Sequence, residues 1–269
     1  MAGMRRLLVC PPEYFRIDYE INPWMHRSNV VNPERAVQQW YELMRVLERE
    51  AGVILEQMTP VPGLPDLVFT ANAGVVVERK AVPSRFRYSE RQREEAYFEG
   101  WFRDHGYEII TLDQGCFFEG AGDLLGFSDC WFGGYRQRSD IRAFPFLSDI
   151  FKQEILPLEL IDQRFYHLDT CFCPLSRGEL LYYPPAFDRY GQAAIAERIS
   201  ADRRVEVSED EALQFACNAV CVGEHVVLPE GCPRVMELLE SRGYRPHPVP
   251  LDEFMKSGGS AKCLTLALD

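Results

Sequence analysis

The sequence lacks several features that would place it in well-defined functional classes. Its 29 Lys and Arg residues form no basic cluster and are outnumbered by 41 Asp and Glu residues, which disfavours nucleic acid and anionic membranes as partners. No hydrophobic run approaches the ~20 residues of a transmembrane helix. The apolar run in MRRLLVC is too short for a signal peptide. We therefore expect a cytoplasmic protein with a small-molecule substrate, and the sequence gives no prediction of its oligomeric state.

The sequence also lacks the cysteine spacing of a disulfide framework or of a structural zinc site. Its nine cysteines include the pairs Cys171 and Cys173 and Cys217 and Cys221, which lie in the apolar patterns of strands. We expect reduced, buried thiols of the kind found in the cytosol. No motif predicts a metal site or an organic cofactor.

A pattern of short apolar strands followed by an amphipathic helix recurs five times along the 269 residues. Opening strands are expected near Val53, Glu108, Leu158, Val205 and Arg245, so the period is roughly 40 to 55 residues, as in propellers and other repeat folds. Helices are expected at 33–51, 89–105 and 147–156, and after Asp188 and Pro233. Further strands are expected in VFTANAGVVV, HLDTCFCPL and CLTLAL.

The last repeat is incomplete, whereas the N-terminus offers a spare strand and a spare helix. Joining the two ends would close a ring of five units and leave no exposed sheet edge. A doubly wound sheet is the alternative α/β architecture. It requires a glycine-rich phosphate loop after its first strand, which this sequence lacks.

In such a ring, equivalent strand ends meet at the axis, so polar residues at those ends are considered together. They are Asp66, Glu119, His167, Asp169 and Cys263. Buried carboxylates need cations, and a planar guanidinium with five N–H donors can satisfy two of them. Ion pairs with arginines of the chain itself are the alternative explanation.

Cys263 follows a Gly-Gly-Ser stretch and stands beside Lys262, whose charge would favour a thiolate nucleophile. The alternative is that it packs in the core as the other cysteines do. His167 and Asp169 are two residues apart, so on a strand both would face one side, giving an acid/base with a carboxylate beside it. A purely structural histidine is the alternative.

The motifs PDLVFTANAG, EGAGD, HLDTCFCPL and GGSAKCLTLAL, in this order, resemble the guanidino-modifying enzymes of the pentein superfamily. The resemblance covers nearly the whole chain and implies an α/β fold, a five-bladed ββαβ propeller formed by a single catalytic domain over residues 1–269. The superfamily includes arginine deiminase, dimethylarginine dimethylaminohydrolase and amidinotransferases. It also includes a non-enzymatic ribosome-associated factor, which would need neither a paired Cys and His nor axial carboxylates.

The resemblance implies a role for each matching residue. Cys263 corresponds to the nucleophile, His167 to the general acid/base and Glu119 to the carboxylate that partners the histidine. The residues implied to contact the substrate are Asp66 and Asp169 at the guanidinium, Asn72, Arg138, and, with a solvated surface role as the alternative, Arg87 and Asn22.

FTANAG, with Asn72, and INPWM are most similar to the catalytic domain of cyanobacterial arginine dihydrolases, which convert arginine to ornithine, ammonia and carbon dioxide. The expected function is therefore arginine hydrolysis through a thiouronium adduct on Cys263, without a cofactor. The alternatives are a deiminase or dimethylargininase that stops at citrulline, or an amidinotransferase. The sequence departs from the family at GYRQRSD, and it lacks the large ornithine-processing domain of the cyanobacterial proteins.

Overall fold

The computed structural model describes residues 5–112 and 115–268, which form five three-stranded sheets. In every sheet the first two strands pair antiparallel and the third pairs parallel to the second. In hydrogen-bonding order the sheets are β15 (Leu266–Ala267), β1 (Arg6–Val9), β2 (Ile54–Gln57); β3 (Gly74–Val77), β4 (Lys80–Pro83), β5 (Glu108–Ile109); β6 (Leu124–Phe127), β7 (Cys130–Tyr135), β8 (Ile155–Glu159); β9 (Phe172–Pro174), β10 (Leu180–Tyr182), β11 (Arg204–Glu206); and β12 (Val220–Val222), β13 (His225–Pro229), β14 (Arg245–Val249).

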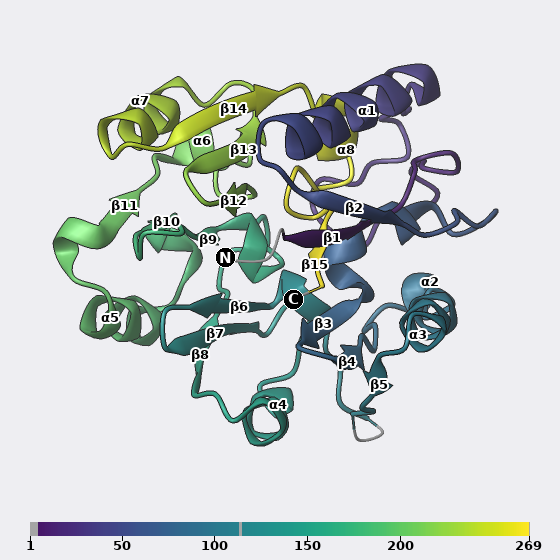
Figure 1. Cartoon of the computed structure of the whole chain (residues 1–269), viewed down its shortest axis with the longest axis horizontal. Coiled ribbons are helices and arrows are strands. Elements are labelled where there is room, and N and C mark those ends of the chain that lie inside the picture. The colour runs from purple at the N-terminus through teal and green to yellow at the C-terminus, as the bar shows by residue number, and fades with distance from the viewer. Residues whose placement is uncertain (1–4, 113–114, 269) are drawn as a thin grey trace.

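The sheets surround a common centre, and the longer helices lie outside them (Figure 1). In each unit a helix connects the second strand to the third, which explains the parallel pairing. The helices are α1 (Pro33–Arg49), α2 (Ser89–Gln92), α3 (Glu95–Asp104), α4 (Ala143–Phe151), α5 (Arg189–Arg198), α6 (Glu209–Ala212), α7 (Pro233–Ser241) and α8 (Asp252–Met255), and the 3₁₀ helices are η1 (Pro65–Val68), η2 (Thr70–Ala73), η3 (Gly120–Gly122), η4 (Leu168–Thr170), η5 (Pro184–Ala186) and η6 (Ala201–Arg203).

The two ends of the described chain share one sheet. Strand β1 pairs antiparallel with β15, where Leu8 lies opposite Leu266, and parallel with β2 on its other side. Helix α1 joins β1 to β2 and is capped by Asn32, whose side chain accepts the backbone N–H of Arg35. The spare N-terminal strand and helix therefore complete the unfinished C-terminal unit, as the repeat pattern predicts.

Three segments that were expected to be strands are turns where they approach the centre. VFTANAGVVV becomes extended only in β3, after η1 and η2. The strand expected to hold His167 and Asp169 is the 3₁₀ helix η4 followed by β9, so the prediction that these two side chains share a strand face is wrong. Thr170 explains this departure, because its backbone N–H and its hydroxyl both bond the carbonyl of His167 and close the turn.

The third such segment is CLTLAL, of which only β15 is a strand. The backbone N–H and the hydroxyl of Thr265 both donate to the carbonyl of Lys262, so Cys263 lies within a turn. Two helices also differ from expectation. The predicted helix 89–105 is interrupted between α2 and α3, and α4 ends at Lys152, whose left-handed φ of 54° stops it before Ile155 and Pro157.

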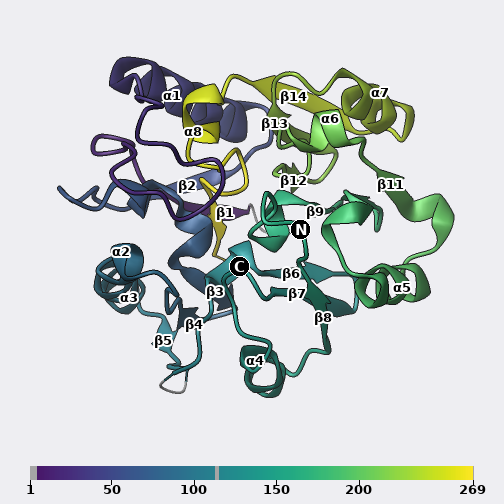
Figure 2. The ribbon, with the colours of Figure 1, turned by 180° about the vertical axis from the view of Figure 1, so that it is seen from behind.

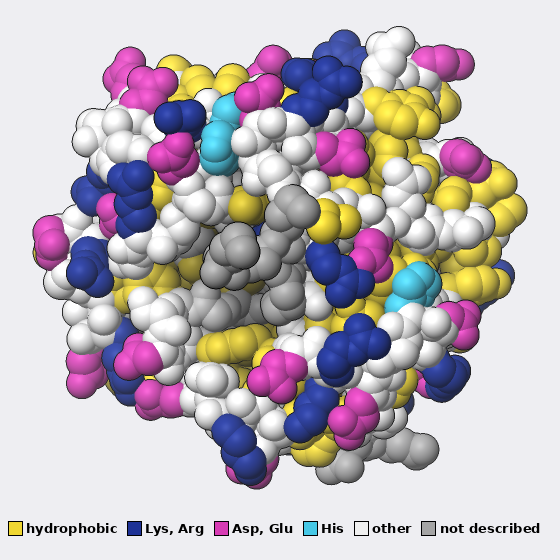
Figure 3. Space-filling view, in the orientation of Figure 1, with side chains coloured by type: hydrophobic (Ala, Val, Ile, Leu, Met, Phe, Trp, Pro, Cys, Tyr) yellow, Lys and Arg dark blue, Asp and Glu magenta, His cyan; other side chains and the backbone are white. Residues whose placement is uncertain are grey.

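In Figure 2, the long segment between β1 and α1 (purple) crosses the back face of the molecule in front of β1 and β2. On the front face, acidic and basic side chains are interspersed and form no continuous patch of one sign (Figure 3). Within the described ranges, no helix combines the length and the apolar character needed to cross a membrane.

The ring depends on buried aromatic side chains that link neighbouring sheets. Phe98 of α3 is fully buried in a cluster with Leu8 of β1 and Leu266 of β15, so it ties the second unit to the sheet that joins the chain ends. Its neighbour Tyr97 is 45% exposed. This pair separates the effect of core packing from the effect of helix propensity.

We expect Phe98→Ala to lower the free energy of unfolding by about 3–5 kcal/mol, because it removes a buried ring and leaves a cavity. Tyr97→Ala, one residue earlier on the exposed face, should cost at most about 1 kcal/mol. Urea titration followed by circular dichroism measures both. Equal losses for the two variants would contradict the placement of Phe98 in the core.

Candidate active site

Five of the nine predicted site residues line one small cavity at the centre, with a free volume of about 10 Å³. The cavity lies where the turns that replace the expected strands meet the segment between β1 and α1. Its lining residues are Ile21, Asn22, Asp66, Phe69, Asn72, Arg91, Arg138, Tyr166, Ser257 and Cys263. Glu119, His167 and Asp169 are buried beside this lining, whereas Arg87 lies farther out and is partly exposed.

The thiol of Cys263 is held in place by Asn218. The Asn218 amide donates to the sulfur at 3.1 Å, and its oxygen accepts the backbone N–H of Cys263 at 3.1 Å and of Ser260 at 3.0 Å. The thiol points at Asp169, with its sulfur 3.6 Å from one carboxylate oxygen. Burial, together with the nearby charge of Asp169, raises the pKa of Cys263 well above its usual range.

Lys262 supplies positive charge that acts on Asp169. Burial raises the pKa of Asp169 to about 7, and the charge of Lys262 opposes that rise. Burial also lowers the pKa of Lys262, an effect that Asp169 and Cys263 oppose. The sequence prediction that Lys262 favours a thiolate has the correct direction, but burial and Asp169 outweigh it.

His167 and Arg138 share the carboxylate of Glu119. The ring Nε2 of His167 lies 2.7 Å from Glu119 Oε2, and an Arg138 N–H donates to the same oxygen at 3.0 Å. Burial alone would raise the pKa of Glu119, but the charge of Arg138 and the contact with His167 hold it well below its usual range. Glu119 is therefore an anion that orients the imidazole.

His167 and Cys263 reach the centre from two sides and are linked by intervening groups. Cys263 and Arg138 line the same cavity, and Glu119 bonds both Arg138 and His167. On the other side, Asp169 follows His167 by two residues and receives the thiol of Cys263. Because η4 turns the chain between them, His167 faces Glu119 while Asp169 faces the thiol.

Asp66 presents one carboxylate oxygen to the cavity without a partner among the described residues. Its Oδ2 accepts the Tyr19 hydroxyl at 3.0 Å, but its buried Oδ1 accepts no hydrogen bond. Burial raises the pKa of Asp66, although Arg91, 3.9 Å away, opposes this. A cation with N–H donors in the cavity would satisfy Oδ1 and restore the anion.

Asn72 is held between two neighbouring segments. Its Oδ1 accepts from Arg91 at 2.9 Å and its Nδ2 donates to the backbone carbonyl of Glu119 at 3.1 Å. A side chain at Gly122 would come within 2.4 Å of the Asn72 amide, so the second glycine of EGAGD permits this close approach. Asn72 thereby joins the FTANAG turn to the EGAGD turn.

Asn22 and Arg138 also line an outer cavity of about 400 Å³, which shares these two residues, Ile21 and Tyr166 with the inner one. Asn22 lies at the boundary between the two cavities. Its amide donates to the Ser257 carbonyl at 3.0 Å, and its oxygen accepts the backbone N–H of Trp24. Arg138 donates to the Ile21 carbonyl at 3.0 Å. A ligand that spans both cavities would have one end at Asp66 and the other near Arg138.

Arg87 faces away from both cavities. Its guanidinium donates to the Arg138 carbonyl at 2.9 Å and to Asp140 at 3.0 Å, and its backbone N–H donates to Glu119. These contacts support the loop that holds Arg138 rather than placing Arg87 against a ligand. Its contact with substrate stays a prediction.

Sequence reasoning missed several buried partners of the site. Arg91 and Glu94, a fully buried ion pair at 2.8 Å, have the i, i+3 spacing that usually indicates a solvated pair on a helix face. Asn218 lies within an apolar strand pattern that gave no signal. Tyr19 and Tyr166 belong to loops without a recognisable motif.

Asp123 is the last residue of the EGAGD motif, and the sequence predicts no individual role for it. Its Oδ2 accepts the hydroxyl of Ser139 at 2.6 Å and its Oδ1 accepts the N–H of Leu168 at 3.0 Å. Ser139 in turn accepts the N–H of Glu119 at 2.9 Å. Asp123 therefore fixes the turn that carries Glu119 relative to the turn that follows His167.

No group of three or more His, Cys, Asp and Glu side chains in the described part of the chain is arranged to hold a metal ion. The groups gathered at the centre are instead one thiol, one imidazole and several carboxylates, three of which lie close to cations of the chain. Such a set can perform nucleophilic and acid/base chemistry on a cationic ligand.

Residues 11–268 match the family model described as N,N dimethylarginine dimethylhydrolase, eukaryotic. The chain belongs to this family. It is 46% identical over 272 aligned residues to the bifunctional arginine dihydrolase/ornithine cyclodeaminase ArgZ of a Synechocystis species, with 99% of the chain covered. It is 37% identical to the N(G),N(G)-dimethylarginine dimethylaminohydrolase of Mycobacterium tuberculosis, covering 98% of the chain and 86% of that protein. The chain spans only 38% of the length of the cyanobacterial relative.

Solved structures show the same fold. The N-terminal domain of ArgZ, as a cysteine-to-serine mutant bound to its substrate, superposes with a TM-score of 0.94 and 44% identity, covering 98% of both chains. An asparagine-to-serine variant of that domain, covalently bonded to a reaction intermediate, superposes equally well. The α/β fold with five small sheets that the sequence predicted is confirmed, as is the resemblance to guanidino-modifying pentein enzymes.

Asp123→Asn should lower the free energy of unfolding by about 1–3 kcal/mol, because the amide that replaces Oδ2 cannot accept the Ser139 hydroxyl and leaves it buried without an acceptor. Asp149→Asn, at an exposed position on α4, is the matched control and should change stability by less than about 0.5 kcal/mol. Chemical denaturation of both variants tests this. A loss no larger than that of the control would show that Asp123 does not hold the two turns together.

Proposed function

We propose that this chain hydrolyses the guanidinium group of arginine and carries the reaction through citrulline to ornithine, ammonia and carbon dioxide. The observation that carries the proposal is the inner cavity, where the unpartnered oxygen of Asp66 and the thiol of Cys263 line the same space. A guanidinium there would donate N–H bonds to Asp66 with its central carbon beside the sulfur. Extensive similarity to the dihydrolase domain of ArgZ supports this choice of substrate.

The first half-reaction begins with activation of the thiol. Burial and, after it, the carboxylate charge of Asp169 keep the pKa of Cys263 high. A bound cation offsets that carboxylate charge, so substrate binding favours the thiolate. The sulfur attacks the guanidinium carbon to form a tetrahedral adduct. His167, held by Glu119, then gives its proton to the departing amine, and ammonia leaves behind a thiouronium on Cys263.

The second half-reaction returns the enzyme to its starting state. His167 takes a proton from water, the resulting hydroxide attacks the thiouronium carbon, and the C–S bond breaks to give citrulline. A second cycle on the bound ureido group releases another ammonia and then a carbamate that yields ornithine and carbon dioxide. One arginine and two waters thus give one ornithine, two ammonia and one carbon dioxide.

Asn72 is proposed to hold the ureido group during the second cycle. Its amide already lies in the cavity lining between Arg91 and the backbone of Glu119. The asparagine-to-serine variant of the ArgZ domain was obtained with a bound covalent intermediate, which supports a role for such an amide after the first attack. Asp169, facing the thiol, would keep the cation close to the sulfur.

Entry of substrate requires the site to open. A free volume of about 10 Å³ is far smaller than the roughly 300 Å³ of an ordinary ligand pocket. The contacts of Asn22 with Ser257 and of Arg138 with Ile21 close the boundary to the outer cavity, so these are the bonds that must break. Once released, Arg138 would be available to the α-carboxylate of the substrate.

Dimethylarginine is the second candidate substrate, because the matched family model and the M. tuberculosis relative carry dimethylargininase names. We further propose that residues 1–269 act as one catalytic unit, a five-bladed propeller closed by the sheet that contains β1 and β15.

Product identification tests the proposed function. Purified protein incubated with arginine should yield ornithine with two equivalents of ammonia, and Cys263→Ser should form neither ornithine nor citrulline while keeping its circular dichroism spectrum. Asn72→Ser should shift the product toward citrulline, because the second cycle loses its amide contact. Amino-acid chromatography with an ammonia assay distinguishes the outcomes, and citrulline as the sole wild-type product would establish a deiminase instead.

Asp66→Asn should lower kcat/KM for arginine by roughly 10- to 100-fold, because a neutral amide replaces the charge-assisted acceptor for the guanidinium. Glu13→Gln removes an exposed carboxylate from the segment between β1 and α1 and should leave kcat/KM unchanged. Steady-state kinetics at pH 7–8 measures both. A fall of similar size in Glu13→Gln would indicate a general charge effect rather than a contact.

A further inference from the structure

A third cavity, larger than the inner one and smaller than the outer one, lies on the other side of the turn that carries Cys263. It has a free volume of about 300 Å³, within the range of small-molecule pockets. Lys262 lines this cavity and Cys263 lines the inner one, so consecutive residues face in different directions. This cavity and the inner cavity share no lining residue within the described ranges, and Lys262 is the one group here whose charge also acts on Asp169.

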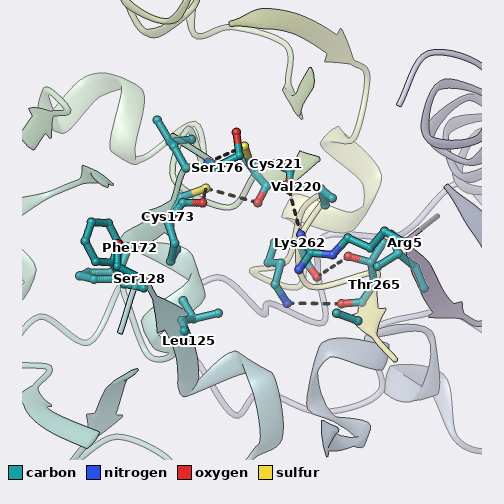
Figure 4. Close-up of a pocket in the computed structure, with 17 residues that line it drawn as sticks. Arg5, Leu125, Ser128, Phe172, Cys173, Ser176, Val220, Cys221, Lys262 and Thr265 are labelled. Carbon is teal, nitrogen blue, oxygen red and sulfur yellow. Dashed lines mark hydrogen bonds between the residues drawn. The ribbon is translucent and has the colours of Figure 1, made fainter. Parts of the chain in front are cut away.

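Two cations face this cavity without an acidic partner in its wall. Figure 4 shows Arg5 and Lys262 entering from the same side, beside Thr265. Among the described residues, the Lys262 ammonium makes one long hydrogen bond, 3.4 Å to the Thr265 carbonyl, and Arg5 donates to the Cys221 carbonyl at 3.2 Å. None of the described lining residues is Asp or Glu.

The two charges also repel each other. The proximity of Arg5 adds to the effect of burial in lowering the pKa of Lys262, and Asp169, which opposes this, lies on the Cys263 side. A half-buried ammonium with one weak bond and a neighbouring guanidinium is an unfavourable arrangement unless an anion joins it. The cavity therefore has an electrostatic preference for negative charge.

The remaining wall is apolar and aromatic. Leu125, Phe127, Phe172 and Leu175 face the cavity from the sheets that contain β6 and β9, opposite the two cations. Small hydroxyls of Ser128 and Ser176 contribute to the wall on the same side. A ligand that suits both sides has one anionic end and a short apolar body.

We propose that this cavity binds a small monocarboxylate, with the carboxylate at Lys262 and Arg5 and the hydrocarbon part against Leu125, Phe127 and Phe172. The carboxylate accepts from the ammonium and the guanidinium and so removes their repulsion. Burial of the hydrocarbon part adds affinity in proportion to its apolar area. This site is separate from the proposed arginine site, and its occupancy does not depend on turnover.

The test is calorimetric titration of the full chain with sodium hexanoate, hexylammonium chloride and 1-hexanol, which share one hydrocarbon chain. We expect hexanoate to bind at least tenfold more tightly than either of the other two. Hexanol that binds as tightly as hexanoate would reduce the cavity to an apolar pocket and overturn the proposal. The absence of detectable hexanoate binding would overturn it too.

Variants locate the binding site. Lys262→Met should weaken hexanoate binding at least tenfold, Lys262→Arg should restore most of it, and Lys80→Met, at a half-buried lysine on β4, should have no effect. Arg5→Met, at an exposed residue whose loss leaves the core intact, should weaken binding about threefold, which keeps the test valid if Lys262→Met folds poorly. Binding that survives Lys262→Met but is lost in Arg138→Met would place the anion in the outer cavity and refute the proposal.

The binding measurement is independent of the proposed catalytic activity. Cys263→Ser should bind hexanoate with unchanged affinity, since Cys263 does not line the cavity that contains Lys262 and Arg5. Hexanoate binding in a protein that fails to hydrolyse arginine would confirm this site and reject the proposed function. Arginine hydrolysis without hexanoate binding would do the reverse.

Discussion

The balance of buried charge at the centre is the constraint on which the rest of the structure depends. Asp66, Glu119 and Asp169 are all nearly inaccessible, and each lies near one cation of the chain. Those cations are Arg91, Arg138 and Lys262. Two further buried carboxylates, Glu94 and Asp123, leave acids in excess. Burial raises the pKa of Glu94 to about 7 and that of Asp123 to about 6, as expected where too few positive charges are present.

The excess of buried carboxylates over buried cations connects the architecture to the proposed chemistry. The turns that carry the acids are fixed to one another by hydrogen bonds, such as those of Asn72 and Asp123, so the acids cannot separate when their charges repel. A cationic substrate completes the balance, which makes binding favourable and at the same time lowers the pKa of the Cys263 thiol. The site is therefore better suited to a guanidinium than to a neutral amide of the same shape.

Much of the fold could be predicted because it rests on periodicity. The strands expected to open each repeat begin within about three residues of the predicted positions, although each of them is the third strand of its sheet rather than the first. Asn32 and Asp188 cap their helices as such residues should. The pairing of β1 with β15 follows from an unfinished repeat at each end. These features depend on local pattern and on the need to avoid exposed sheet edges, and both are visible in the order of residues.

The centre was harder to predict because contacts there are long-range. Sequence motifs identified Cys263, His167 and Glu119, but the partners that hold them lie far away along the chain. Asn218 and Cys263 are 45 residues apart, and no local pattern connects them. Likewise, Arg91 and Glu94 have the spacing of a surface pair, and only the packing of α2 against η1 and η2 buries them.

The turn found in place of an expected strand at His167 and Asp169 explains how the site is arranged. On a regular strand, His167 and Asp169 would face the same side, and the imidazole would compete with the thiol for one carboxylate. The turn η4 separates them, so that His167 pairs with Glu119 and Asp169 with Cys263. Lys262 and Cys263 are consecutive and line different cavities, as adjacent residues of a strand also would. The departure from strand geometry at η4 thus gives His167 and Asp169 different electrostatic surroundings, whereas on a regular strand these two residues would share one face.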